Sequence, residues 1–255
     1  MPGAADHLDP PQPVQRHPGL GSIRQLGNYG LWPPRRACII LSQAAQHEAG
    51  AQSNDQLSHR ENMSVYREKL VQAVLFFAQE TRHLNTTKLM KLLNFFDFEH
   101  FRQAGYPSIG LQYYAFEKGP VPKKFWLEVK DGLPPSDLKD KIAINTKTGE
   151  GDRKELEFLA RPGQKVDFSV FTRREKEILQ NLAFIYRDAT AKVMSDISHE
   201  AEKPWEITVK EKGTNAEIDY LLALDEKSPI DRDEAEENLQ DLFAVLRAFD
   251  IEPAK

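Results

Sequence analysis

The stretch from Lys88 to Ala104 constrains the fold more than any other part of the chain. Apolar side chains surround it on nearly all sides: Leu89, Met90, Leu92, Leu93, Phe95, Phe96, Phe98 and Phe101. A helix with this pattern is normally central and buried. We therefore expect a core helix here, begun by N-cap oxygens from residues 85–87 and ended by Gly105 as its C-cap.

A carboxylate, Asp97, lies in the middle of the apolar face of this predicted helix. A buried carboxylate needs a counter-charge or several hydrogen-bond donors. Two interpretations follow. Asp97 could form an acid–base pair with His100, three residues further along the same face, or it could anchor backbone amides or a lysine in the core. We favour the anchor, because no second catalytic group has an interpretable spacing to Asp97.

Shorter patterns predict the elements on either side of this helix. Helices are expected over Ser64–Thr81, from Pro122 to about Asp131, from Thr172 to about Arg187, around 193–197, near Glu217–Leu224 and over Asp231–Asp250. Strands are expected near 111–117, 140–145 and 154–160, joined in one sheet. The predicted fold class is α+β and predominantly α-helical, a helical domain with a small antiparallel β-sheet.

Local patterns refine these elements. Thr172 and Glu175 have the spacing of a capping box. Pro120 and Pro122 make Gly119–Pro122 a rigid corner that prepares the next helix. The buried faces expected for two later helices are Ile178, Leu179, Leu182, Ile185 and Tyr186, and Leu239, Leu242, Phe243, Leu246 and Phe249.

Residues 1–62 differ in composition from the rest of the chain. They contain no Lys and no Phe, although the chain has 14 Phe, and they include seven of its 16 Pro. Such a segment has too few apolar side chains to offset ordering entropy, so we expect it to be disordered. It is either a flexible leader or sequence upstream of a true start at Met63, and the compositional break at a methionine favours the second. The folded domain is expected over residues 63–255.

The net charge of −5 is distributed unevenly along the chain. Residues 118–154 carry nine basic and six acidic side chains, whereas residues 200–255 carry seven basic and sixteen acidic ones. The chain lacks the basic footprint of a general nucleic-acid or anionic-membrane binder. The acidic C-terminal third suits a basic protein partner, although solvated helix faces are the simpler explanation.

Cysteine usage and hydropathy indicate the compartment. The one cysteine, Cys38, offers neither a disulfide framework nor a Cys-based zinc site. No apolar run approaches the roughly 20 residues that span a bilayer. We therefore expect a cytoplasmic protein with no membrane segment and no cofactor.

A small basic and aromatic patch combines Lys118, Lys123 and Lys124 with Trp126. Such a patch could contact a partner or phosphate, although a solvated helix start is the simpler explanation. The alternative function that it allows is a DNA-binding transcriptional regulator, which would use this patch or Lys88 and Lys91.

His199 invites two sharper hypotheses. With nearby Ser195, Asp196 and Ser198 it suggests a hydrolase triad, but no nucleophile-elbow glycines surround either serine. A metal site from His199, Glu200 and Glu202 lacks the usual ligand spacing. We prefer a histidine that fixes a helix end against Trp205, and we predict no catalytic residues, no metal and no enzymatic activity.

Four motifs follow one another along the chain. They are KLMKLLNFFDFEHFRQAG, which contains Asp97; KGPVPKKFW, which contains Gly119, Pro120 and Pro122; FTRREKEIL; and SDISHEAEKPW, which contains Ser198, His199 and Trp205. In this order and spacing they resemble the Panacea-domain family, which includes SocA-like antitoxins and phage-associated GepA-like proteins, over Met63–Phe249. The chain departs from the usual pattern at Asn94–Phe96, where the family has a tyrosine and an alanine, and at Gly110–Leu111, where it often has Gly-Asp.

This resemblance implies a function without catalysis. Proteins of the family look like the antitoxins of toxin–antitoxin systems, which neutralise a toxin by direct binding, and some deliver it to a protease. The motif residues named above would then be structural. The expected partners are a cognate protein toxin encoded nearby and a cellular protease, and the resemblance does not imply which toxin.

Overall fold

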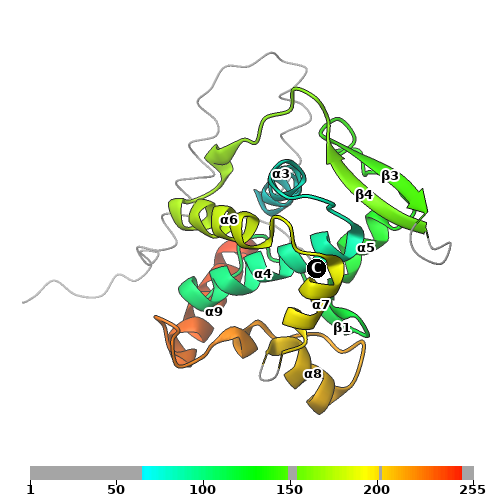
Figure 1. Ribbon diagram of the computed structural model, residues 1–255. Helices are drawn as coiled ribbons and strands as arrows, with labels where there is room; N and C mark the ends of the chain where they lie inside the picture. The colour runs from blue at the N-terminus through cyan, green and yellow to red at the C-terminus, as the bar shows by residue number, and fades with distance from the viewer. Residues whose placement is uncertain (1–64, 149–153, 201–202, 249–255) are drawn as a thin grey trace, which may run out of the picture. The chain divides into compact units, whose positions relative to one another are not determined.

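The computed structural model describes residues 65–148, 154–200 and 203–248 (Figure 1). This part of the chain forms seven α-helices, two short 3₁₀-helices and two small antiparallel sheets. The predicted fold class, α+β and predominantly α-helical, is confirmed. The expectations for residues 1–62 concern a segment outside the described residues.

Helix α4 (Thr86–Ala104) is central, as predicted. It packs against α3 (Val65–Glu80), α6 (Arg173–Tyr186), α7 (Ala191–Ser198) and α9 (Arg232–Ala248), helices from both ends of the described chain. Most of its side chains are buried, polar ones included. Its all-round apolar pattern thus reflects neighbours on several sides.

The two ends of α4 form as the sequence predicts. At the start, the Asn85 side chain accepts a hydrogen bond from the Lys88 amide. At the end, Gly105 adopts a left-handed conformation with φ +77°, and its amide donates to the Phe101 carbonyl. An added side chain at Gly105 would also meet the backbone of Ala235 in α9 at 3.0 Å. Glycine is therefore required both by the turn and by the close approach of α9.

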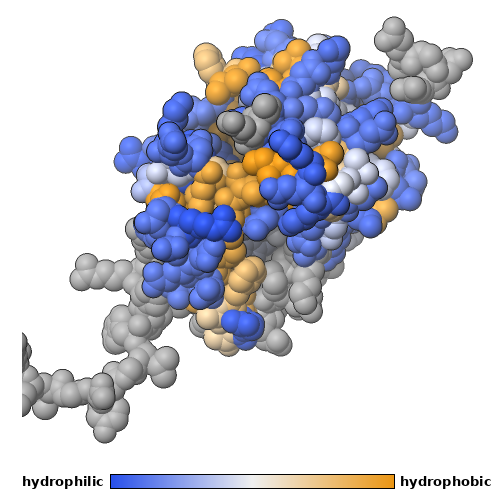
Figure 2. Space-filling model, turned by 90° about the horizontal axis from the view of Figure 1, so that it is seen from below, coloured by the Kyte–Doolittle hydropathy of each residue, from blue (hydrophilic) through white to orange (hydrophobic). Residues whose placement is uncertain are grey.

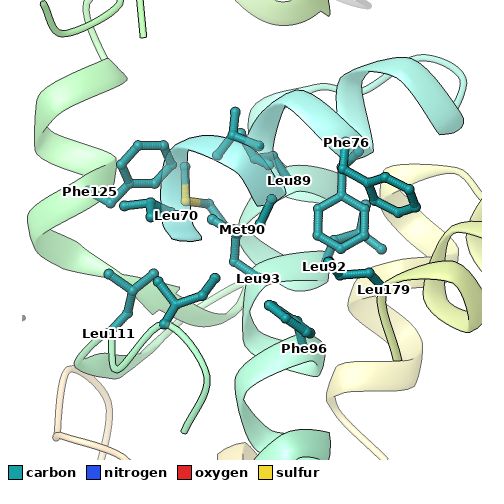
Figure 3. Close-up of a cluster of buried hydrophobic side chains, with 14 of the residues drawn as sticks. Leu70, Phe76, Leu89, Met90, Leu92, Leu93, Phe96, Leu111, Phe125 and Leu179 are labelled. Atoms are coloured by element: carbon teal, nitrogen blue, oxygen red, sulfur yellow. The ribbon is translucent and has the colours of Figure 1, made fainter. Parts of the chain in front are cut away.

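The main hydrophobic core gathers around α4 (Figure 3). Figure 3 shows side chains from several elements meeting there: Leu70 and Phe76 from α3; Leu89, Met90, Leu92, Leu93 and Phe96 from α4; Leu111 after α4; Phe125 from α5 (Lys123–Val129); and Leu179 from α6. Burying each such side chain contributes roughly 1.5–3 kcal/mol. Packing, more than helix propensity, therefore fixes α4 at the centre.

The strands form two separate sheets, so the single predicted sheet is wrong. Strand β1 (Tyr113–Phe116) pairs with β2 (Gly119–Pro122), and β3 (Ile142–Thr148) pairs with β4 (Lys154–Ala160), both antiparallel. The expected proline corner is itself a strand, because the turn at residues 117–118, followed by Gly119 with φ +103°, folds residues 119–122 back onto β1.

Segments that are distant in sequence cover one free edge of each hairpin, where the other hairpin could have paired. The second edge of β1 pairs with residues 215–218 through Ala115 and Tyr113. On β4, the Phe158 amide donates to the Leu84 carbonyl just before α4. The β1–β2 hairpin and the β3–β4 hairpin thus each pair with a segment that is remote in sequence, and they do not pair with each other.

The remaining elements agree with the prediction in position and differ in extent. The 3₁₀-helix η3 (Phe168–Val170) precedes α6, and the expected helix near Glu217–Leu224 is only the 3₁₀-helix η4 (Tyr220–Ala223). Helix α8 (Pro204–Lys212) was not predicted. Its proline lies in the first turn, where a missing amide hydrogen costs nothing.

Two residues that we expected to be buried are exposed. Ile185 is 63% exposed beside Phe184 at 86%, so these two side chains in the last turn of α6 point away from the core. Phe243 of α9 is 40% exposed, because α9 packs through Leu242 and Leu246. The expectation for Phe249 falls outside the described residues. None of the described helices is long and apolar enough to cross a membrane.

Candidate functional site

Asp97 is an anchor for backbone amides, as we favoured. Its carboxylate is fully buried, and it accepts hydrogen bonds from the amides of Ile109 at 2.6 Å, Gly110 at 3.3 Å and Leu111 at 3.3 Å. The Tyr113 and Tyr220 hydroxyls donate to it at 3.0 and 3.2 Å. These donors tie α4 to the loop after it, to β1 and to η4.

The protonation of Asp97 reflects two opposing effects. Burial disfavours the charged form and raises the pKa of Asp97 to about 6, although the donors from Ile109, Leu111 and Tyr113 act to lower it. The carboxylate therefore still carries its charge near neutral pH. Burial raises the pKa of the two tyrosine donors, and the Asp97 charge acts in the same direction.

The acid–base pair of Asp97 with His100 is wrong. His100 Nδ1 lies 2.8 Å from the Tyr106 carbonyl oxygen and is committed to that contact. Burial lowers the pKa of His100, so the neutral ring is favoured. His100 fixes the turn that follows α4.

Glu175, predicted only as part of a capping box, is a second buried carboxylate. The predicted capping box is present, since Glu175 accepts from the Thr172 amide at 2.7 Å and its own amide donates to Thr172. The same carboxylate also accepts from Lys69 Nζ at 2.7 Å and Ser108 Oγ at 2.6 Å. Burial alone would raise the pKa of Glu175, but these groups outweigh it and lower the pKa to about 2. Local sequence shows the cap and cannot show partners 67 and 106 residues away.

Gly119 brings together motif residues from three elements. A Cβ atom built on Gly119 would meet Lys91 Nζ first, then Ser198 Oγ at 2.7 Å and His199 Nε2 at 2.9 Å. Lys91 comes from α4, whereas Ser198 and His199 come from the end of α7. We call Lys91, Gly119, Ser198 and His199 the Gly119 cluster.

Lys91, expected from the sequence only as a possible DNA contact, is a buried member of this cluster. Its side chain is 1% exposed, and Nζ donates to the Pro120 carbonyl oxygen at 3.2 Å. Burial lowers the pKa of Lys91 to about 7. The signal in the sequence was its position inside a helix that is apolar on all sides.

His199 fixes the end of α7 against Trp205, as we preferred. The two rings stack with centroids 3.8 Å apart and an interplanar angle of 14°. Trp205 Nε1 donates to the Phe116 carbonyl oxygen at 2.8 Å, which ties α8 to β1. His199 Nε2 is buried and has no hydrogen-bond partner in the described part of the chain.

The structure supports neither the hydrolase triad nor the metal site that we considered for His199. Ser198 Oγ donates to the Ser195 carbonyl oxygen at 2.8 Å, within its own helix turn. Among the described residues, which exclude Glu202, no group of three potential metal ligands comes together.

Two lysines of the alternative DNA-binding hypothesis cannot contact DNA. Lys88 and Lys91 are both buried. Lys88 Nζ donates to the carbonyls of Arg82 at 2.8 Å and Arg187 at 2.9 Å, so it caps the C-terminal end of α6. That part of the hypothesis is wrong.

The predicted basic and aromatic patch lies on the β1–β2 turn and α5. Lys118, Lys123 and Lys124 are exposed, and Trp126 is half-buried. Lys123 Nζ lies 5.6 Å from the centre of the Tyr114 ring, within the range of a cation–π contact. Elsewhere, Figure 2 shows a face on which apolar side chains gather among hydrophilic ones.

The comparisons with known proteins point to one family. A search of curated proteins and a search of solved structures found no match. Residues 89–206 match the family model described as "Antitoxin SocA-like, Panacea domain". This range contains Asp97, the Gly119 cluster and Trp205, and it is narrower than the Met63–Phe249 span over which the motifs resemble the family. Residues 89–206 are therefore similar to the Panacea domain of SocA-like antitoxins.

Proposed function

We propose that this protein is the antitoxin of a toxin–antitoxin system and neutralises, by direct binding in the cytoplasm, a protein toxin encoded beside it. The match of residues 89–206 to the SocA-like antitoxin model carries this proposal. The buried polar groups support it, because Asp97, Glu175 and Lys88 are each committed to structural hydrogen bonds. Such a domain presents a binding surface and does its work without catalysis.

The surface proposed for the toxin is the patch of Lys118, Lys123, Lys124 and Trp126. Its three lysines are exposed on a short hairpin turn and the first turn of α5. Pro120 and Pro122 restrict the backbone between them, so the charges are presented with little loss of conformational entropy. An acidic region of the toxin would complement this patch.

Expression of the adjacent gene with and without this protein tests the antitoxin role. We expect growth arrest from the neighbour alone and normal growth when both are expressed. A neighbour that is harmless, or toxic in both cases, would overturn the proposal. Following the toxin's half-life in cells with and without this protein then shows whether it also delivers the toxin to a protease.

A matched pair of double variants tests the surface. Lys123→Ala/Lys124→Ala removes two adjacent charges from the first turn of α5, and Arg173→Ala/Arg174→Ala does the same at the start of α6. We expect the lysine variant to weaken toxin binding at least tenfold and the arginine variant to change it less than threefold. Equal effects would move the interface away from this patch. The competing surface is the acidic segment 200–255, and Asp233→Lys/Glu237→Lys, at the start of α9, tests it.

A further inference from the structure

We propose that Lys91 and His199 carry at most one positive charge between them, and that protonation of both groups loosens α7 and α8 from the β1–β2 hairpin. The proposal concerns a conformational response built into the Gly119 cluster. It does not depend on which partner the protein binds.

The geometry places two basic nitrogens against the same glycine. A Cβ on Gly119 would meet both Lys91 Nζ and His199 Nε2, the latter at 2.9 Å, so only the missing side chain leaves them room. The Lys91 ammonium has three hydrogens, and the Pro120 carbonyl accepts one of them at 3.2 Å. His199 Nε2 is buried without a partner in the described chain. A neutral His199 can turn a lone pair toward the Lys91 ammonium, and a protonated His199 cannot.

The surroundings oppose two charges at this place. Burial lowers the pKa of both groups, and the Lys91 charge lowers that of His199 further. Asp196, on α7, and the backbone of Lys118, at the hairpin turn, act in the opposite direction on His199. From α8, His199 meets the uncharged ring of Trp205. Two bases this close titrate as one coupled pair.

His199 connects the end of α7 to Trp205 of α8, so a movement of His199 affects both helices. It is the C-cap of α7, and its ring stacks on Trp205, whose indole N–H donates to Phe116 of β1. Repulsion between two charged bases moves His199 away from Gly119 and draws Trp205 with it. The pKa values of both groups are lowered in the folded chain, so stability falls as pH falls. The Lys91 contribution is lost as pH falls from 10.5 to about 7, and the second charge, on His199, forms only below its ordinary pKa of 6.5. Acid therefore releases α7 and α8 from the hairpin.

Histidine NMR on the full chain tests the shared proton. The signal that disappears in His199→Gln is that of His199. This signal is then titrated with pH in the natural protein and in Lys91→Met. We expect the pKa of His199 to lie below 6.5 in the natural protein, where burial and the Lys91 charge lower it, and to be higher in Lys91→Met, where only burial still lowers it. An unchanged His199 titration in Lys91→Met would overturn the proposal.

Trp205 fluorescence tests the loosening. Trp32→Phe/Trp126→Phe leaves Trp205 as the single tryptophan, since the chain has three. We expect its emission to shift to the red as pH falls from 8 to 5.5, while far-UV circular dichroism stays constant, and the shift to vanish in His199→Gln. Emission that is flat across this range, or a shift that persists in His199→Gln, would overturn the proposal. If Lys91→Met fails to fold, Lys91→Gln replaces it in the NMR titration. The fluorescence titration of the protein that has Trp205 as its single tryptophan needs neither Lys91 variant.

Discussion

Among the glycines that the structure describes, Gly119 is the one at which an added Cβ would meet the closest neighbour. Its φ of +103° is unfavourable for any residue with a Cβ, and that Cβ would meet Lys91, Ser198 and His199. The backbone and the packing therefore both require glycine. Gly163 has a similar backbone, φ +79°, but nothing within 4 Å of an added Cβ.

This contrast gives a stability prediction. Gly119→Ala should lower the free energy of unfolding by about 3 kcal/mol, since backbone strain and overpacking add. Gly163→Ala should cost about 1 kcal/mol, because only backbone strain remains. Urea unfolding of both variants measures the difference. Equal losses would mean that the Lys91, Ser198 and His199 contacts impose no constraint of their own.

Asp97 should be the costliest single carboxylate to remove. Asp97→Ala leaves three amides and the Tyr113 hydroxyl without their acceptor, whereas the Tyr220 hydroxyl keeps the Leu111 carbonyl oxygen at 2.6 Å; each unpaired buried group carries a desolvation penalty. We expect a loss of roughly 3 kcal/mol or more. Tyr220→Phe should cost about 1–2 kcal/mol, because it also removes the donor at 2.6 Å from the Leu111 carbonyl.

Tyr114→Phe is the control for Asp97→Ala and Tyr220→Phe. Tyr114 is only half-buried and its hydroxyl lies 3.5 Å from Gln112 Oε1, so Tyr114→Phe should change stability by less than about 0.5 kcal/mol. Chemical denaturation of the three variants gives the order Asp97→Ala, Tyr220→Phe, Tyr114→Phe. A different order would show that the anchor contributes little.

At the level of elements, local sequence determines helix ends well and strand partners poorly. The ends of α4 and the capping box of α6 depend on residues within four positions, so composition and spacing reveal them. The single sheet was wrong because strand pairing depends on which edges other segments cover. Residues 215–218 cover β1 and Leu84 covers β4, and neither pairing has a signature in local sequence.

The same limit applies to the candidate site. Asp97 stood out because a carboxylate inside an apolar helix is unusual, and the anchor role followed from physical chemistry. Lys91 lies in the same helix and has an equally unusual position, but its role depends on Gly119 and His199, which α4 meets only in the folded chain. Glu175 was recognised as a cap, and its partners Lys69 and Ser108 are remote in sequence.

Helix α6 should lose a specific part of its stability in acid. The pKa of Glu175 falls on folding from 4.5 to about 2, so its contribution is present above about pH 4.5 and is lost as pH falls toward 2. This shift corresponds to about 3 kcal/mol. Glu175→Gln should therefore be much less stable than the natural protein at pH 6 and nearly equal to it at pH 2.5.

Urea unfolding at both pH values measures this effect, and Glu177→Gln is the control on the same helix. Glu177 is exposed and pairs only with the exposed Arg173 among the described ion pairs, so its removal should change stability by less than about 0.5 kcal/mol at either pH. A stability gap for Glu175→Gln that does not narrow in acid would show that its bonds to Lys69 and Ser108 do not depend on its charge.

Across the whole described domain, buried polar groups join the elements that the hydrophobic core brings together. Asp97 links α4 to β1 and η4, Glu175 links α6 to α3, and the Gly119 cluster links α4 to β2 and α7. Apolar packing tolerates small rotations of a helix, whereas a charged group with several donors accepts few arrangements. These ties therefore define how the exposed β1–β2 turn and α5 are presented.

The described domain also predicts how the chain tolerates shortening. Its core contacts begin with Tyr66 and Leu70 of α3, so a chain that starts at Met63 keeps every residue that these contacts use. We expect such a chain to melt within about 2 °C of the full-length protein, because a change of 1 kcal/mol corresponds to roughly 2–4 °C for a domain of this size. It should also neutralise the toxin equally well if residues 89–206 carry the binding function. A chain that starts at Leu75 is the control, since it lacks Tyr66 and Leu70 and should not fold. A large drop in melting temperature for the Met63 version would show that residues 1–62 contribute to the stability of the domain.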